Sequence, residues 1–127
     1  MKNFKKYFQI PEKRDQVFLA LTNPLTISLW SGEPAEGTDK VNHEFSIYNG
    51  SIVGKVLEIE ENKKICQQWY FGDSEKPSIV DLILHDLPNG TSLEVRHSNI
   101  PDEAFEEITD GWENIFFRDL LDFYSPE

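Results

Sequence analysis

Large apolar residues recur every three or four positions through the last part of the chain, and this pattern constrains the fold more than any other feature of the sequence. The series consists of Phe105, Ile108, Trp112, Ile115, Phe116, Leu120 and Phe123. Its period is that of an amphipathic helix of roughly six turns. Pro101 stops the preceding segment, and Asp102 suits a helix N-terminus. We therefore expect one long helix over residues 102–123.

Alternating apolar and polar residues predict the strands that precede this helix. The first runs from Phe4 to Ile10, and the others cover residues 41–48, 51–60, 64–71, 78–86 and 91–98. Asn49-Gly50 is a hairpin signal, because both residues tolerate positive φ. Gly54 inside the third strand indicates a bulge or a close backbone approach. Successive hairpins of this kind predict an antiparallel meander.

Two short helices are expected between the first and second strands. Residues 11–22 place apolar side chains on one helical stripe, with Pro11 suited to the first turn. Residues 24–30 form a second helix that ends in Trp30, and a loop rich in Gly and Pro covers residues 31–40. The sequence thus predicts one α+β domain over residues 1–127, in which a curved antiparallel sheet of about six or seven strands wraps around the C-terminal helix.

The charge distribution argues against nucleic acid and anionic membranes as partners. The net charge is −11, and residues 101–127 hold nine Asp or Glu against one Arg. A phosphate backbone needs clustered Lys and Arg instead. The acidic helix face fits a basic partner or, more simply, a solvated surface. Cys66 is the one cysteine, and neither a secretory signal nor a membrane-spanning run is present, so we expect a cytoplasmic protein.

Several local motifs resemble one known family. Ala20-Leu21-Thr22-Asn23-Pro24, followed by Trp30, resembles the start of domains related to the activator of the 90-kilodalton heat-shock-protein ATPase. Residues 50–54 (GSIVG) and 64–69 (KICQQW) resemble the central hairpin of that family. Thr109-Asp110-Gly111-Trp112 resembles the Gly-Trp signature in its last helix. The likeness extends from about Phe8 to Phe123 and implies the helix-grip fold of the START-like, birch-pollen-allergen-like superfamily.

Three functions from different classes follow from these observations. The first is a binding module for a hydrophobic small molecule or a protein partner between the sheet and the last helix. The second, implied by the resemblance, is a protein that regulates a chaperone ATPase. The third is a cyclase-like enzyme that acts on an aromatic or polyketide-like ligand. No cofactor is expected, because the sequence has no phosphate-binding glycine loop and no cysteine pair of metal-ligand spacing.

Aromatic residues and histidines supply the candidate site. The cavity candidates are Trp30, His43, Phe45, Tyr48, Trp69, Phe71, His97, Phe105, Trp112 and Phe116. A ligand pocket of this kind is apolar with a few orienting polar groups, here His43, His97, Tyr48 and Tyr70. The alternative is that these rings simply fill the core. His43 or His97 would be the acid or base of an enzyme.

Other reactive side chains have simpler interpretations. His43, His85 and His97 could ligate zinc, but a hydrogen-bonded histidine explains each one better. Asp81 alternates against Val80 and Leu82, which indicates the exposed face of the sheet. Cys66 is expected to be a small buried hydrophobe.

Three further expectations concern the last helix and the entrance to a cavity. Trp112 should be the most buried residue of the helix. Gly111 beside it should mark a position where a side chain would clash with a neighbouring element. Trp30 should lie at the cavity mouth with loop 31–40 as the gate, unless Trp30 merely plugs the core.

Overall fold

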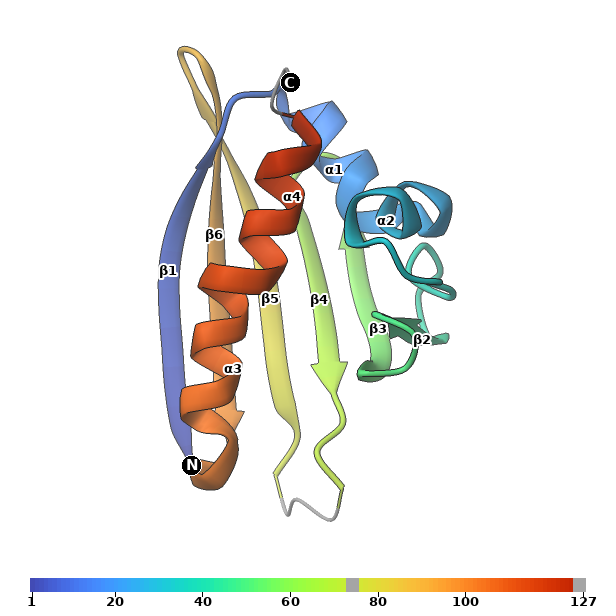
Figure 1. The fold of residues 1–127 in the computed structure, drawn as a ribbon, viewed down its shortest axis with the longest axis vertical. Helices are drawn as coiled ribbons and strands as arrows, with labels where there is room; N and C mark the ends of the chain where they lie inside the picture. Colours follow the sequence, from blue (N-terminus) through green and yellow to red (C-terminus); the bar gives the residue numbers. More distant parts are fainter. Residues whose placement is uncertain (73–75, 125–127) are drawn as a thin grey trace.

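A strongly curved sheet forms the framework of the molecule. The computed structural model describes residues 1–72 and 76–124. Within these residues six antiparallel strands lie in the order β1-β6-β5-β4-β3-β2. Their bounds are β1 (Lys2–Ile10), β2 (Glu44–Ile47), β3 (Ile52–Glu60), β4 (Lys64–Trp69), β5 (Ser78–Leu87) and β6 (Gly90–Ile100). Strands β2 to β6 form the expected meander, and β1 completes the other edge by pairing with β6 (Figure 1).

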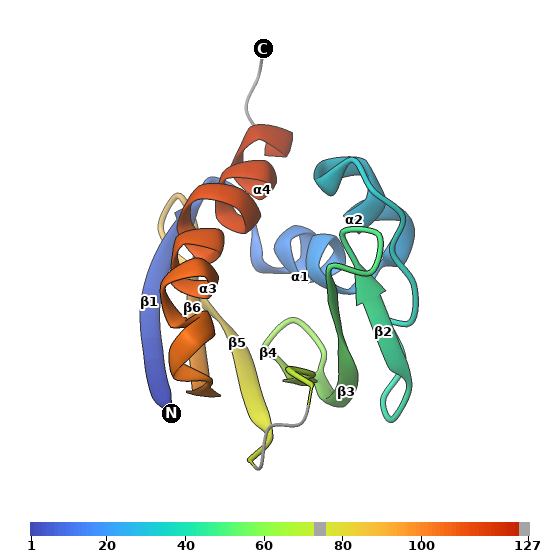
Figure 2. The same cartoon turned by 60° about the horizontal axis from the view of Figure 1, so that its bottom comes forward.

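The helices occupy the concave side of this sheet. Helices α1 (Arg14–Thr22) and α2 (Pro24–Ser31) follow β1. Residues 102–124 form the C-terminal helix, which consists of a 3₁₀ turn η1 (Asp102–Ala104), α3 (Phe105–Gly111), a π-helical turn η2 (Trp112–Phe116) and α4 (Phe117–Tyr124). Figure 2 shows the sheet curving around α1 and this helix. The predicted α+β architecture is therefore confirmed. Within the described part of the chain, no helix has the length and apolar character needed to cross a membrane.

Alternation along the central strands builds the core. Val80 and Leu82 of β5 and Val95 of β6 point toward the helices and are almost fully buried. Phe8 of β1 packs on Phe117 of α4 with ring centroids 4.2 Å apart. Burying each such side chain stabilises the fold by roughly 1.5–3 kcal/mol. Asp81, as predicted, lies on the other face of β5, where its side chain is 27% exposed.

Two elements begin three residues later than the sequence predicted. Helix α1 begins at Arg14, because β1 extends to Ile10 and the next residues turn the chain. The hydroxyl of Thr91 donates to the Glu12 carbonyl at 2.6 Å and fixes that turn. Strand β2 is limited to Glu44–Ile47, because Asn42 adopts a left-handed conformation with φ of 69°. A left-handed residue interrupts the extended backbone.

Gly54 marks a close approach of two strands, as the sequence indicated. A Cβ atom at this position would lie 1.9 Å from the Gln68 carbonyl oxygen of β4. The bulge in β3 lies further along, between Val56 and Glu58. Only glycine therefore allows β3 and β4 to pair at this point.

Candidate binding groove

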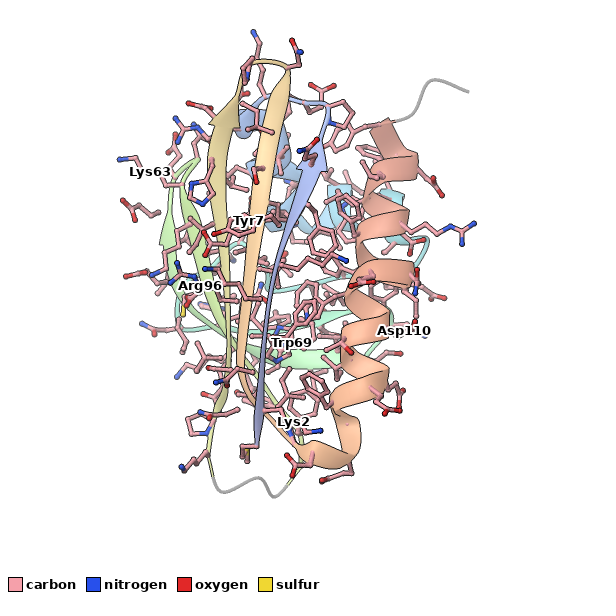
Figure 3. The ribbon with its side chains drawn as sticks, turned by 90° about the vertical axis from the view of Figure 1, so that its left-hand side faces the viewer. Lys2, Tyr7, Lys63, Trp69, Arg96 and Asp110 are labelled. Carbon is pink, nitrogen blue, oxygen red and sulfur yellow. The ribbon has the colours of Figure 1, made fainter. Side chains whose placement is uncertain are left out.

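Four aromatic rings pack between the end of β4, the C-terminal helix and α2. Trp69 and Trp112 are stacked, with ring centroids 5.0 Å apart and planes inclined by 22°. Phe116 lies 4.8 Å from Trp112, and Trp30 meets Phe116 edge-on at 5.1 Å. Figure 3 shows Trp69 in the space between sheet and helix. Aromatic pairs contribute about 0.5–1.5 kcal/mol each beyond their burial, so this cluster fixes the helix against the sheet.

A chain of hydrogen bonds runs from Trp112 into the sheet. The Trp112 indole N–H donates to Nδ1 of His97 at 3.0 Å. Nε2 of His97 lies 2.8 Å from the Ser78 hydroxyl, which itself donates to the Ser98 carbonyl at 3.0 Å. Because indole is only a donor, Nδ1 must be unprotonated and Nε2 must carry the hydrogen. These contacts therefore select one neutral tautomer of His97.

The environment of His97 also opposes its protonation. The side chain is 1% exposed, and burial lowers the pKa of His97 to about 4. Trp69 and Phe71 flank the ring at 4.9 Å and 6.2 Å. The second indole is engaged as well, since the Trp69 N–H donates to Oε1 of buried Gln67 at 3.0 Å. Both indole donors thus point into the protein.

An apolar groove of about 270 Å³ opens beside this cluster. The tip of the β2–β3 hairpin forms one wall, the end of β4 the floor, and the C-terminal helix the other wall. The lining residues are Tyr48, Ser51, Ile52, Trp69, Glu107, Ile108, Gly111, Trp112, Ile115 and Phe116. Six of these residues belong to the C-terminal helix. They form two neighbouring rows, 107/111/115 and 108/112/116, because residues i and i+4 lie on one face of a helix.

Gly111 and the π-helical turn shape the helical wall. The turn closes with the Phe117 N–H bonded to the Trp112 carbonyl, which widens the helix locally. Apart from its chain neighbours and the backbone of its own helix, a Cβ atom on Gly111 would meet no atom within 4 Å. The expected clash at Gly111 is therefore wrong, and the missing side chain instead leaves room in the groove. Single π turns inside α-helices frequently occur at functional sites.

Tyr48 links the hairpin wall to the helical wall. Its hydroxyl donates to Oδ2 of Asp119 on α4 at 2.8 Å. Burial, followed by this bond to Asp119, raises the pKa of Tyr48 well above its ordinary value. The phenol therefore stays protonated near neutral pH and serves as a donor.

The structure divides the predicted site residues into three groups. Tyr48, Trp69, Trp112 and Phe116 line the groove. Trp30, Phe71 and His97 pack behind them. The remaining three lie elsewhere. Phe45 is buried under the β2–β3 pair, Phe105 is half-buried with Nζ of Lys2 5.0 Å from its ring centroid, and His43 is exposed in the loop before β2.

The expected gate at Trp30 is wrong. Trp30 is 7% exposed, and its indole N–H donates to the Ala20 carbonyl at 2.8 Å. Neither Trp30 nor loop 31–40 lines the groove. The buried Thr38 hydroxyl donates to the Thr22 carbonyl at 2.6 Å and ties the loop to the end of α1. Trp30 therefore plugs the core.

Other candidate reactive groups do not reach the groove. His43 was expected within the strand over residues 41–48, but the left-handed Asn42 removes it from the sheet. Cys66 was expected to be buried, yet it is half-buried on the outer face opposite Asp81. Burial and the Asp81 carboxylate raise the pKa of its thiol to about 12. Among the described residues, no cluster of three His, Cys, Asp or Glu could hold a metal ion.

Six of the groove residues were missed in the sequence. They are Ser51, Ile52, Glu107, Ile108, Gly111 and Ile115. Ile108 and Ile115 belong to the predicted apolar stripe, so helical spacing could have included them. Glu107 follows from the same spacing, four residues before Gly111. Ser51 and Ile52 lie at the tip of a hairpin, and no local sequence pattern indicates how close this tip lies to the helix.

A second hollow lies at the opposite end of the sheet. It measures about 600 Å³ and lies between the start of α1 and the β5–β6 turn. No aromatic residue lines it, and its Arg14 and Asp86 side chains pair with each other at 2.8 Å. Ligand pockets are mostly apolar and aromatic, so the smaller groove is the better candidate.

Comparison with known proteins gives a family and one partial relative. The family described as activator of Hsp90 ATPase homolog 1-like protein matches residues 12–123. A protein of Schizosaccharomyces pombe, described as uncharacterized, is 27% identical over an alignment of 109 residues that covers 74% of this chain and 32% of that protein. The chain thus spans about a third of the length of this relative.

Solved structures have the same architecture. An HSP90 activator from Plasmodium falciparum has a TM-score of 0.86 and 27% identity, over 94% of each chain. CalU16 from Micromonospora echinospora has a TM-score of 0.82 and 25% identity, over 98% of this chain and 76% of the other. The Aha1 dimer from Colwellia psychrerythraea has a TM-score of 0.81 and 22% identity, over 96% and 95% of the two chains. The last likeness concerns the fold alone.

Proposed function

Because this chain belongs to the family of activator of Hsp90 ATPase homolog 1-like proteins, we propose that it is a START-like binding domain that holds a hydrophobic small molecule between the sheet and the C-terminal helix. The observation that carries this function is the apolar groove of about 270 Å³ with two stacked tryptophans in its lining. A single domain over residues 1–127 and a cytoplasmic location stay predictions from the sequence.

The composition of the groove supports a small apolar ligand. Apolar side chains make up most of its lining, and Tyr48, Ser51 and Glu107 are its polar side chains. Ligand sites typically combine such an apolar surface with a few polar groups that orient the ligand. The volume is slightly below the roughly 300–1,000 Å³ of pockets for drug-sized molecules, which favours a small ligand.

Gly111→Leu tests whether the groove is the binding site. The new side chain should fill the groove without straining the helix, because nothing lies near the Cβ position. Native mass spectrometry of freshly purified protein would detect a bound ligand, and displacement of an apolar fluorescent dye would measure its affinity. Binding should be lost in Gly111→Leu and kept in Asn114→Leu, which adds a leucine on the exposed side of the helix. Dye binding that is absent, or equal in both variants, would refute the small-molecule function.

Regulation of a chaperone ATPase is the second candidate. It is favoured by the 27% identity, over 94% of each chain, to an HSP90 activator from Plasmodium falciparum. A pull-down and an ATPase assay with the 90-kilodalton chaperone of the same host would test it. A stable complex together with a changed ATPase rate would support this role, and the absence of both would exclude it.

Neither of the two histidines expected to serve a cyclase-like enzyme is available in the groove. Both nitrogens of His97 are engaged within the protein, and His43 does not line the groove. General acid–base catalysis requires a group within hydrogen-bond reach of the substrate. We therefore do not extend the proposal to an enzymatic reaction.

A further inference from the structure

The polar groups that line the groove differ in whether they can still form a hydrogen bond or ion pair with a ligand. Both indole N–H groups of its lining are already engaged, at Gln67 and at His97. The Tyr48 hydroxyl is committed to Asp119. Of the lining side chains, only Ser51 retains an uncommitted donor, and none is a Lys or Arg. A carboxylate or phosphate on the ligand would find little to bind it here.

Glu107, in contrast, presents a carboxylate without a partner. Its side chain is exposed at the groove rim, and it forms no hydrogen bond or ion pair with the residues that the structure describes. Some other carboxylates of the same helix are engaged, and those without a partner among the described residues, such as Glu106, do not line the groove. Asp102 pairs with the N-terminal ammonium at 2.7 Å, and Glu113 pairs with Lys6 at 2.6 Å.

We infer that the occupant of the groove is a hydrophobic amine, with its apolar body against the aromatic lining and its ammonium group at Glu107. This inference rests on the function proposed above. Ammonium–carboxylate hydrogen bonds are about twice as strong as neutral ones. Indole and phenyl rings also attract a cation within about 6 Å of their centroids. The aromatic lining and the rim carboxylate therefore select the same kind of ligand.

The charge distribution around the groove also favours a cationic ligand. The exposed side of the helix next to the groove carries Glu103, Glu106 and Asp110, and the chain as a whole has a net charge of −11. Figure 3 shows Asp110 on the side of the helix that faces away from the sheet. A field of one sign around a binding site raises the local concentration of oppositely charged ligands and repels those of the same sign.

Three naphthalene derivatives of matched size test the inference. 1-Naphthylmethylamine, 1-naphthylmethanol and 1-naphthoate are cationic, neutral and anionic near neutral pH. We expect the amine to bind about tenfold more tightly than the alcohol at low ionic strength, and the carboxylate to bind most weakly. Isothermal titration calorimetry would measure all three affinities. Added salt should weaken the binding of the amine alone.

Glu107→Gln identifies the carboxylate responsible. It should reduce the affinity for the amine to that for the alcohol and leave the affinity for the alcohol unchanged. Glu106→Gln is the matched control, because it removes the same charge from the neighbouring exposed position outside the groove lining. This control should retain most of the preference for the amine.

The outcomes separate this inference from the function on which it rests. If the alcohol or the carboxylate binds as tightly as the amine, and Gly111→Leu abolishes that binding, the groove is a binding site but the preference for amines is wrong. The same holds if Glu107→Gln leaves the preference unchanged. If none of the three probes binds in a manner that Gly111→Leu abolishes, both the groove function and the preference for amines are wrong.

Discussion

The hydrogen bonds of His97 depend on its charge state. Nδ1 accepts from Trp112, and Nε2 donates to Ser78. A second proton on the ring would place two donors, the indole N–H and Nδ1–H, against each other. Because Trp112 lines the groove, the protonation state of His97 influences a residue of the groove wall.

Stability should consequently fall at mildly acidic pH. The pKa of His97 is about 4 in the folded chain and about 6.5 when exposed, so the unfolded chain takes up the proton first. The contribution of His97 is therefore complete above pH 6.5 and is lost as the pH falls toward 4. The expected loss is about 3 kcal/mol. Urea denaturation at several pH values between about 4 and 7.5 would measure it.

His97→Gln separates this effect from the titration of carboxylates. The variant is less stable near neutral pH, but the free energy of unfolding should change less steeply between about pH 6.5 and 4.5. His43→Gln, which replaces an exposed histidine outside the aromatic cluster, is the matched control. Parallel profiles for the native chain and His97→Gln would contradict the role of His97.

Truncation of Trp112 tests the aromatic cluster directly. Trp112→Ala should lower the free energy of unfolding by roughly 3–5 kcal/mol, because it removes a buried ring and leaves a cavity. Leu120→Ala in α4 should lower the free energy of unfolding by about 2–5 kcal/mol. Chemical denaturation would measure both. A loss below about 1 kcal/mol at Trp112 would mean that the helix is not a core element.

Burial of single residues was only partly predictable. His97 was named as a cavity candidate and is buried, but its partners Ser78 and Trp112 come from other elements. Trp112 was expected to be the most buried residue of the helix. It is 2% exposed, whereas Leu120 is 0% exposed, because the smaller side chain is enclosed completely.

Two glycines in regular elements should respond to alanine in opposite ways. Gly111 has helical φ and ψ of −61° and −39° and free space at the Cβ position. Gly111→Ala should therefore raise the free energy of unfolding by about 1 kcal/mol, the propensity difference between glycine and alanine. Gly54→Ala should be strongly destabilising, because its Cβ would overlap the Gln68 carbonyl. Thermal unfolding followed by circular dichroism would measure both variants.

A destabilised Gly111→Ala would mean that the π-helical turn needs glycine at its start. A stable Gly54→Ala would mean that β3 and β4 can separate at little cost. Either result would contradict the prediction for that glycine.

Element type was predictable where periodicity extended over many residues. The apolar repeat between Phe105 and Phe123 predicted the C-terminal helix. It did not predict the π-helical turn, since the i to i+5 bond is determined by packing rather than by spacing. The strand expected over residues 41–48 was too long, because alternation continued through Asn42 while the backbone did not.

At the scale of the whole molecule, turn signals and alternation predicted the meander and the helix that it encloses. The resemblance to the family extended this to the curved sheet. The groove had no such signal, because it depends on how far the β2–β3 hairpin stands from the helix. That separation is determined by side chains that lie far apart in the sequence.

The Tyr48–Asp119 hydrogen bond spans this separation, and Tyr48→Phe tests what it contributes. Asp119 would lose a donor while half-buried, so the free energy of unfolding should fall by about 1 kcal/mol. Amide hydrogen exchange should accelerate mainly in residues 48–53, because the hairpin would open locally. Tyr70→Phe is the matched control, since its hydroxyl donates to Glu44 at 3.0 Å on the exposed surface and should contribute little. If exchange increases equally throughout the sheet in Tyr48→Phe, the bond stabilises the fold as a whole and does not hold the hairpin wall of the groove.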